Sequence, residues 1–547
     1  MILTNSKYNI LGFIGGAHSC GVAYIRKGEL VCVLEEERLT RVKSHIDFEN
    51  DFNRFPTMSI ETLINRYGLD LNEIDYFTTF LRYDEAYPIF EDFGFNLPEN
   101  KFIKVDHHLS HAALSYYLSG FQEDSLVFCA DASGGNGYNS KTYIGSQGKL
   151  KFIDGNPNSR MSLGHFYGAL TEIVGFKRLK DEGKVVGLSG HGRFWQDLYD
   201  RWNNVLRIED IRTNKDNHHL ESGGVYRDLN VAIFDLFGSK YWKAQHCLQD
   251  IAYTGQFIFE NKVLEWLNNL HNHFPNVRKL VLSGGIFANV KLNKRINELD
   301  WVEELFVLPP MGDEGLAFGS AIATLKQLEP SLMPFRTSMY LGNEYSKDEF
   351  YNAVPEILDS WTHYPLDLDT ISELLLDKKI LGLYQGRSEH GARALGNRSI
   401  ICDCRNEETY QILNNKLQRN DFMPFAPAVL DEDAHKIFDV QKSRFSAEFM
   451  TILFDTKEEY REWIPTVVHP VDKTARIQIV KEDSNKLFYD ILKNFQGHSG
   501  IGCLVNTSFN IHNEPIVERP EEALTHLKNG IIDYLITPYG IWKYGNY

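Results

Sequence analysis

The sequence contains few cysteines and no apolar run long enough to cross a membrane. No window approaches the roughly 18 consecutive apolar residues of a membrane-spanning helix, and the first residues lack the charged and apolar regions of a signal peptide. The seven cysteines are odd in number, scattered and never spaced as CxxC, which argues against a disulfide framework and a zinc ribbon. These absences predict a reduced, cytoplasmic protein.

An excess of positive charge is missing as well, because the formal net charge is −17 at pH 7. Non-specific binders of polyanions need a basic surface, so the charge argues against that class, although local arginine pockets can still hold small anions. The 547 residues are too many for one hydrophobic core. We predict a large first domain over residues 1–345, a linker over 346–370 and a smaller second domain over 371–547.

The first part of the chain repeats one rhythm of apolar segments and glycine-containing turns. The segments lie at residues 10–14, 20–25, 30–34 and, in the second copy, 126–130, 141–145 and 150–153. Residue identity between the copies is slight. Each copy nevertheless has the order of a strand, a turn of a size that suits a phosphate, a second strand, a glycine turn and a third strand. The repeat predicts a duplicated domain, with two unrelated hairpins as the alternative.

One segment joins two histidines to a buried strand. If Asp106 caps a helix, His107 and His111 lie four residues apart on one face, where they can chelate a divalent ion. The apolar run 126–130 reads as a central strand that ends at Asp131 and a glycine-rich turn, where open α/β sheets hold ligands. An isolated histidine pair at this spacing is more often structural, but the aspartate and the glycines favour a metal site.

Several glycine turns follow strands in the same domain. The motif SGGIFAN places Gly284 and Gly285 after a strand and Asn289 at a helix start, which offers N–H groups to a nucleotide. The loop EGKVVGL adds Lys184, which could meet a phosphate, although this loop alone is weak evidence. Asp313 begins a later helix and is the natural fourth metal ligand or, equally, a simple helix cap.

The second domain begins with a dense group of arginines. Arg387, Arg393, Arg398 and Arg405 fall within nineteen residues, and Lys416, Arg419, Arg476, Asn506, Thr507, Ser508 and Asn510 follow. Because guanidinium groups hold phosphate bidentately, this composition predicts an oxyanion pocket rather than a solvated charged surface.

Motifs across nearly the whole chain resemble the O-carbamoyltransferases of antibiotic and nodulation-factor biosynthesis. They are DHHLSHAALS, ADASGG, EGKVVGL, LSGGIFAN, GDEG, QGRSEHGARALGNRSI, PFAPAVL, TARIQ and NTSFNIHNEPIV. The resemblance implies an α/β first domain of the actin and sugar-kinase type, similar to tRNA threonylcarbamoyl-transfer proteins. It also implies a smaller α/β second domain that is similar to carbamoyl-adenylate-forming proteins.

The resemblance also implies three groups of site residues. The implied metal ligands are His107, His111, Asp131 and Asp313, with Fe²⁺ as the metal and Mg²⁺ or Mn²⁺ as alternatives. The implied ATP site contains Ser133, Gly134, Gly135, Gly164, Lys184, Gly284, Gly285, Asn289 and Gly312. The implied carbamoyl phosphate site contains Arg387, His390, Arg393, Arg398, Lys416, Arg419, Asn506 and Ser508.

The chain departs from the family pattern at several of these motifs. The family commonly has proline at Ala392, an aromatic residue at His390, arginine at Met423 and glycine at Asn513. Met423 removes one expected positive charge, so either another arginine substitutes or phosphate is held less tightly. The family's His-Asp-Ser becomes His18-Ser19-Cys20, and His18 is either the general base toward the acceptor or a turn histidine.

The resemblance implies ATP-dependent transfer of a carbamoyl group from carbamoyl phosphate, through carbamoyl adenylate, to a hydroxyl. A non-enzymatic ATP-driven scaffold would leave the arginine-rich domain unexplained, and a metallopeptidase would need the HExxH glutamate that is missing. The expected acceptor is a small sugar-like or nucleoside-like molecule, and a homodimer is possible. Arginines, lysines and aromatics within 193–243 keep a hydroxymethylated pyrimidine, free or in DNA, as the alternative acceptor.

Overall fold

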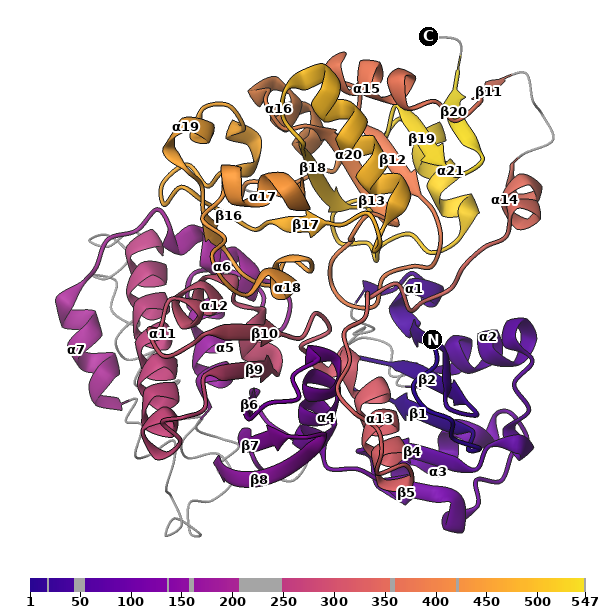
Figure 1. The fold of residues 1–547 in the computed structure, drawn as a ribbon, viewed down its shortest axis with the longest axis vertical. Helices are drawn as coiled ribbons and strands as arrows, with labels where there is room; N and C mark the ends of the chain where they lie inside the picture. The colour runs from indigo at the N-terminus through magenta and orange to yellow at the C-terminus, as the bar shows by residue number, and fades with distance from the viewer. Residues whose placement is uncertain are drawn as a thin grey trace. The chain divides into compact units, whose positions relative to one another are not determined.

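The chain forms two compact units in the computed structural model (Figure 1). The structure describes residues 1–16, 19–43, 55–134, 137–156, 162–205, 248–354, 360–419 and 423–545. The first unit contains Met1–Thr78, Tyr83–Phe102 and Thr337–Tyr547, and the second contains Thr79–Arg82 and Ile103–Arg336. The N-terminal segment therefore clusters with the C-terminal part of the chain, and the predicted boundaries at residues 345 and 371 remain a prediction.

The first sheet begins with an antiparallel meander, and its strands have the order β3-β2-β1-β4-β5. β1 pairs antiparallel with β2 and parallel with β4. The strands are β1 (Ile10–Ile14), β2 (Gly21–Arg26), β3 (Glu29–Glu35), β4 (Tyr76–Thr79) and β5 (Phe102–Lys104). The helices of this segment are α1 (Glu36–Thr40), α2 (Thr57–Tyr67) and α3 (Tyr83–Glu91).

The sheet of the second unit repeats this topology with the order β10-β9-β6-β7-β8. β6 pairs antiparallel with β7 and parallel with β9. The strands are β6 (Ser125–Ala130), β7 (Ser140–Ser146), β8 (Lys149–Asn156), β9 (Lys279–Ser283) and β10 (Glu304–Val307). In both sheets a three-stranded meander is followed by a parallel strand on the far side of its first strand, which confirms the predicted α/β fold and its duplication.

Helices α4 and α13 form the packed centre of the second unit, with α4 beside β6 and β7 (Figure 1). Asp106 caps α4 by accepting a hydrogen bond from the Leu109 N–H at 3.0 Å, as predicted. α4 is buried on nearly every side because α13 and the sheet both contact it. The helices of this unit are α4 (His107–Ser119), α5 (Leu163–Ile173), α6 (Glu182–Ser189), α7 (Gln196–Val205), α11 (Leu248–His273), α12 (Val290–Asn297) and α13 (Leu316–Leu328).

Gly319 allows α13 to lie close to α4, since a Cβ there would lie 2.2 Å from the Ser110 carbonyl oxygen. We expect Gly319→Ala to lower the free energy of unfolding by about 1 to 3 kcal/mol, because the helices must move apart. Gly497→Ala in α20 (Lys486–Ser499) is the control: open space surrounds that position, so alanine should stabilise the fold by about 0.4 to 1 kcal/mol. Thermal unfolding of both variants tests this, and equal effects would contradict it.

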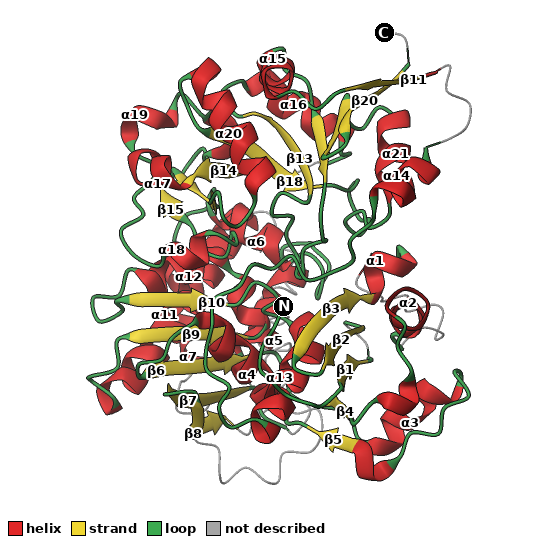
Figure 2. Ribbon diagram, turned by 45° about the vertical axis from the view of Figure 1, so that its right-hand side comes forward, coloured by secondary structure: helices red, strands yellow, loops and turns green. Residues whose placement is uncertain are grey.

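The C-terminal part of the first unit is a mixed sheet with the order β11-β20-β19-β12-β13-β18-β14-β17, which Figure 2 shows with its helices. Phe488, Ile491, Leu492 and Phe495 of α20 recur at helical spacing, so one face of this helix is buried in the core. The strands are β11 (Trp361–Tyr364), β12 (Leu381–Tyr384), β13 (Arg398–Asp403), β14 (Ala426–Leu430), β17 (Gln478–Val480), β18 (Cys503–Ser508), β19 (Tyr534–Thr537) and β20 (Gly540–Tyr544), with a separate pair β15 (Phe454–Asp455) and β16 (Thr474–Ala475).

The helices of this part alternate irregularly with the strands along the chain. They are α14 (Lys347–Ala353), α15 (Leu368–Leu376), α16 (Glu407–Lys416), α17 (Asp431–Ile437), α18 (Arg444–Ala447), α19 (Glu458–Arg461), α20 (Lys486–Ser499) and α21 (Pro520–Lys528). Across the described ranges, no helix combines the length and the apolar character that a bilayer crossing needs.

Candidate functional site: a metal-ligand cluster and an arginine group

Four predicted metal ligands lie together in the second unit. His107 and His111 come from successive turns of α4, Asp131 directly follows β6, and Asp313 begins the short helix before α13. Their four ligand atoms all lie within 4.8 Å of one another. The His111 Nε2 lies 3.0 Å from Asp131 Oδ2 and 3.6 Å from Asp313 Oδ1, and the His107 Nε2 lies 3.5 and 3.6 Å from the same two oxygens.

The chemistry of this cluster fits a divalent cation. The Nε2 atoms of both histidines and Oδ2 of Asp131 are buried and have no hydrogen-bond partner that satisfies normal geometry. Buried polar atoms without partners are costly, and a cation at their common focus would satisfy all of them. Two imidazoles and two carboxylates are a donor set that Fe²⁺, Mn²⁺ or Zn²⁺ accepts, so the residues do not select one metal.

The electrostatics of the cluster also fit a divalent cation. Burial alone would raise the pKa of Asp131, but the neighbouring histidines outweigh it and hold that pKa well below its usual range. Burial would lower the pKa of His111, yet the carboxylates of Asp131 and Asp313 raise it to about 10. The carboxylates therefore stay ionised at neutral pH and attract positive charge, whether protons or a metal ion.

Outer contacts orient two of the ligands. Ser283 Oγ lies 3.2 Å from the His111 Nδ1, which leaves Nε2 directed at the carboxylates. The Gly285 N–H donates to Asp131 Oδ1, so Oδ2 is the oxygen left for the cluster. Such contacts fix the ring orientation and the ligand oxygen before any ion binds.

Glycines allow two turns and the start of α5 to lie close to the end of β6. Gly284 has φ +102°, and a Cβ there would lie 2.1 Å from the Ala130 carbonyl oxygen. A Cβ on Gly164 would lie 2.7 Å from the Ala132 nitrogen, and one on Gly134 would lie 2.3 Å from Cε1 of His108. These predicted ATP-site glycines therefore lie next to the metal-ligand cluster, where main-chain N–H groups can approach a phosphate.

The other predicted ATP-site residues have varied surroundings. Asn289 caps α12 and exchanges hydrogen bonds with Gln256, so its side chain is engaged within the protein. Lys184 forms an ion pair with Asp181 at 3.2 Å. The Gly312 N–H donates to Glu314 Oε1 at 3.2 Å, Ser133 is exposed, and Gly135 lies outside the described residues.

Arg393 interacts with two other arginines of the first unit, Arg419 and Arg476. Desolvation by surrounding protein, followed by the charge of Arg419, lowers the pKa of Arg393, although Arg393 still reaches solvent. Desolvation and the charge of Arg393 hold the pKa of Arg476 well below its usual range. Within the described ranges, no carboxylate forms an ion pair with Arg393 or Arg476. An anion placed among these guanidinium groups would relieve their repulsion.

Arg476 was the less obvious member of this group. It follows Arg393 by more than eighty residues, and only its basic character within VHPVDKTARIQIV marked it in the sequence. Asn506 lies at the same location, since its Nδ2 donates to the Ala394 carbonyl at 3.2 Å and to Gln478 Oε1 at 2.6 Å. Ser508 lies two residues further along β18, opposite Ser399 of β13.

The remaining predicted anion-site residues contact other protein groups. Arg398 is fully buried, stacks 4.0 Å from the Tyr384 ring centroid and donates to the carbonyls of Gln385, Gly386 and Asn397. Lys416 forms an ion pair with Asp533 at 2.6 Å. Arg398 and Lys416 are therefore engaged within the protein.

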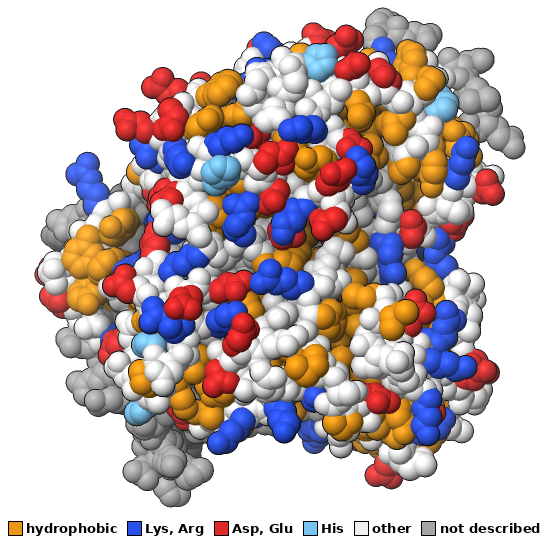
Figure 3. Space-filling model, in the orientation of Figure 1, with side chains coloured by type: hydrophobic (Ala, Val, Ile, Leu, Met, Phe, Trp, Pro, Cys, Tyr) orange, Lys and Arg blue, Asp and Glu red, His pale blue; other side chains and the backbone are white. Residues whose placement is uncertain are grey.

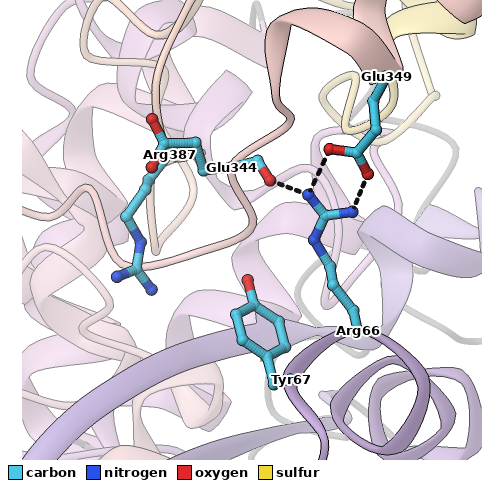
Figure 4. A pocket seen from close by; sticks show the side chains of 5 residues that line it. All are labelled: Arg66, Tyr67, Glu344, Glu349 and Arg387. Atoms are coloured by element: carbon cyan, nitrogen blue, oxygen red, sulfur yellow. Dashed lines mark hydrogen bonds and ion pairs between the residues drawn. The ribbon is translucent and has the colours of Figure 1, made fainter.

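Arg387 lines a separate pocket of about 380 Å³ (Figure 4). Its guanidinium donates to the carbonyls of Val31, Leu341 and Gly342. In the same pocket Arg66 is held by Glu349 and by the main-chain oxygen of Glu344, as Figure 4 shows. Arg387 therefore fastens main-chain segments, and the charge of Arg66 is already matched.

Two histidines, His390 and His18, are also among the predicted site residues. His390 is buried with its Nδ1 2.9 Å from Glu35 Oε1, so it is also engaged within the protein. His18, the predicted general base, lies outside the described residues.

A duplicated α/β domain with a metal-ligand cluster, followed by an arginine-rich domain, matches the comparisons with known proteins. The family described as Carbamoyltransferase N-terminus matches residues 96–322, and Carbamoyltransferase C-terminus matches residues 372–542. An uncharacterized protein of Methanocaldococcus jannaschii is 34% identical, over 96% of this chain and 98% of its own length.

Two relatives with functional names are more distant. Nodulation protein NolNO of Sinorhizobium fredii is 29% identical over 95% of this chain and 78% of its own. The 3'-hydroxymethylcephem-O-carbamoyltransferase of Amycolatopsis lactamdurans is 26% identical over 66% of this chain and 65% of its own. The chain belongs to the carbamoyltransferase family, which confirms the resemblance seen in its motifs. The protein is thus an enzyme, a carbamoyltransferase of the group that includes the nodulation and cephem proteins.

Proposed function

We propose that this carbamoyltransferase uses ATP to move the carbamoyl group of carbamoyl phosphate, through carbamoyl adenylate, to the hydroxyl of a small sugar-like or nucleoside-like acceptor. The observation that carries the proposal is the presence of two chemically different sites in one chain. The cluster of His107, His111, Asp131 and Asp313, ringed by glycine turns, suits a cation with a polyphosphate. The group of Arg393, Arg419 and Arg476 suits a small acyl phosphate.

The reaction balances in three steps. Water cleaves carbamoyl phosphate to carbamate and inorganic phosphate at the arginine group. A carbamate oxygen attacks the α-phosphorus of ATP, pyrophosphate leaves, and carbamoyl adenylate forms. The acceptor hydroxyl then attacks the carbamoyl carbon, its proton passes to a base, and AMP leaves. Adenylation is needed because carbamate is a poor electrophile and AMP is a good leaving group.

The chain's own residues would divide these tasks. The arginines hold the phosphate of the donor through charge-assisted hydrogen bonds. The glycine turns bring main-chain N–H groups to the ATP phosphates, and the two histidines and two aspartates would hold a divalent cation. A cation bound there supplies charge neutralisation for the polyphosphate. Carbamate decomposes in water, so efficient transfer requires that carbamate react with ATP before it decomposes.

One assay tests the donor half of this proposal. The protein is mixed with carbamoyl phosphate, ATP and a divalent metal, without acceptor. We expect release of inorganic phosphate and, with labelled pyrophosphate, exchange of the label into ATP that depends on carbamoyl phosphate. An ATP-driven scaffold would show neither. Absence of both activities with Fe²⁺, Mn²⁺ and Mg²⁺ in turn would overturn the proposal.

The acceptor is expected to be a small neutral alcohol rather than DNA. Acidic and basic side chains are interspersed on the face shown in Figure 3, without a continuous basic patch for a nucleic-acid backbone. Trp202, one of the aromatics that could have stacked on a base, is buried against Phe166. Most of the basic and aromatic residues that suggested DNA, in 206–247, lie outside the described residues.

A panel of acceptors decides between a small alcohol and DNA as the acceptor. Aminoglycosides, nucleosides and DNA that contains hydroxymethylated pyrimidines are each incubated with carbamoyl phosphate and ATP. Mass spectrometry then detects the addition of one carbamoyl group. We expect at least one small alcohol to be modified and the DNA to stay unchanged. Modified DNA with unmodified small molecules would reverse the assignment.

A further inference from the structure

The peptide of Gly391 is held on both sides by charged residues from the N-terminal part of the chain. Its N–H donates to Oε1 of Glu35 at 2.6 Å, and its carbonyl accepts from Nη2 of Arg38 at 2.9 Å. Glu35 and Arg38 also form an ion pair, with Nε 3.4 Å from Oε2. Gly391 has φ +114°, a conformation that favours glycine, so the turn it forms is specific.

This contact is buried and strongly charged. The Arg38 side chain is 4% exposed, and the neighbouring His390 side chain, 2.9 Å from Glu35, is fully enclosed. Burial would raise the pKa of Glu35, but Arg38, His390 and the Gly391 N–H outweigh it and lower that pKa to about 2. Glu35 is therefore an anion at neutral pH, and a buried ion pair with directional hydrogen bonds defines one geometry closely.

The other end of the same loop is fixed by Glu389. Its Oε1 accepts hydrogen bonds from the N–H groups of Leu395, Asn397 and Arg398, at 2.7, 2.8 and 3.2 Å. Arg393 lies between this anchor and the Gly391 anchor. The loop is thus held at Gly391 and at Leu395, which are four residues apart. Arg393, which interacts with Arg419 and Arg476, lies midway between these two points.

A loop that carries like charges toward one another needs such support. Arg393 interacts unfavourably with both other arginines when no anion is present, and a free loop would move it away. We propose that Glu35 and Arg38 are positioning residues for the anion site: by holding the Gly391 peptide they place Arg393 for the phosphate of the donor. This inference rests on the proposed function of the arginine group and adds the N-terminal segment to that site.

Arg41 provides a matched control on the same stretch of chain. It too donates to two main-chain carbonyls of the C-terminal part, at Pro515 (2.8 Å) and Ile516 (2.6 Å), and pairs with Glu522 at 3.3 Å. It therefore makes the same kind of contact as Arg38 but away from the Arg393 loop. A contact that served stability alone would give the two arginines equivalent effects.

The experiment compares Arg38→Met with Arg41→Met in the full chain. For Arg38→Met we expect the KM for carbamoyl phosphate in phosphate release to rise about tenfold or more, because displacement of a binding group weakens its contacts. The KM for ATP in pyrophosphate exchange should stay unchanged, and Arg38→Lys, which keeps one donor, should be intermediate. Arg41→Met should leave both values at the wild-type level.

Two further measurements keep the result decisive. If Arg38→Met does not fold, Glu35→Gln combined with Arg38→Met removes both charges while keeping an oxygen for the Gly391 N–H, and replacement of a buried ion pair is often tolerated. Calorimetric titration with inorganic phosphate measures binding at the anion site even if the wild-type protein does not cleave carbamoyl phosphate. Such a lack of cleavage would contradict the proposed function but not this inference. Unchanged phosphate affinity and KM in the folded Arg38 variants, or the same loss in Arg41→Met, would overturn the inference.

Discussion

Replacement of His107 or His111 by alanine is expected to abolish carbamoyl transfer while carbamoyl phosphate is still cleaved. Each histidine supplies one of the four ligand atoms of the cluster in the second unit. Loss of an outer-shell partner already costs about 10- to 100-fold in metal affinity or activity, so loss of a ligand should cost at least about 100-fold. Metal content, pyrophosphate exchange and phosphate release are measured on the same preparations.

The control for this experiment is His271→Ala. His271 belongs to the same unit, stacks on Trp301 with ring centroids 4.3 Å apart and lies outside the cluster. It should keep metal content and exchange activity. A His107→Ala protein with full metal content and full transfer would show that the cluster is not the metal site. Loss of phosphate release together with exchange would show that the two reactions share one site.

Replacement of Arg393 or Arg476 by alanine should have the converse effect, with phosphate release reduced and ATP binding retained. Under the proposed function, each variant would lose a charge-assisted contact to the donor phosphate. Such a contact is worth roughly 2 to 3 kcal/mol, which corresponds to about 30-fold or more in affinity or rate. Initial rates of phosphate release against carbamoyl phosphate concentration, together with nucleotide binding by calorimetry, provide the measurement.

Two other arginines serve as controls that distinguish a loss of phosphate binding from a loss of stability. Arg405 is paired with Asp403 at 2.7 Å, so Arg405→Ala should leave phosphate release near wild type. Arg398→Ala should mainly lower the unfolding temperature, because it leaves several buried carbonyls without a donor. Normal phosphate release in Arg393→Ala and Arg476→Ala would place the donor site elsewhere in the chain.

Much of the fold follows from local patterns in the sequence. The apolar segments of both copies become β1 to β3 and β6 to β8, because a buried strand needs a short run of apolar residues between turns. Asp106 caps α4 as its position before HHLSH indicates, and the spacing of His107 and His111 then follows from helical geometry. Gly284 has the positive φ that a close turn after a strand requires.

The roles of the arginines depended on tertiary structure. Arg387, Arg393 and Arg398 are close in sequence and look equivalent, yet Arg387 and Arg398 donate to main-chain carbonyls while Arg393 meets Arg476. Composition reports how many cations a segment contains. The direction of each side chain depends on the strand pairing and loop path around it.

The contacts of Gly391 could not be predicted from the sequence either, and they join residues that are farther apart along the chain. Glu35 and Arg38 reach Gly391 across more than 350 residues of chain. Before folding, nothing in EEERLTR distinguishes these side chains from an ordinary solvated charged surface. The strands and helices can be predicted from the sequence because their signals are local and periodic. Which charges are buried together is seen only in the folded protein, because burial depends on packing between distant segments.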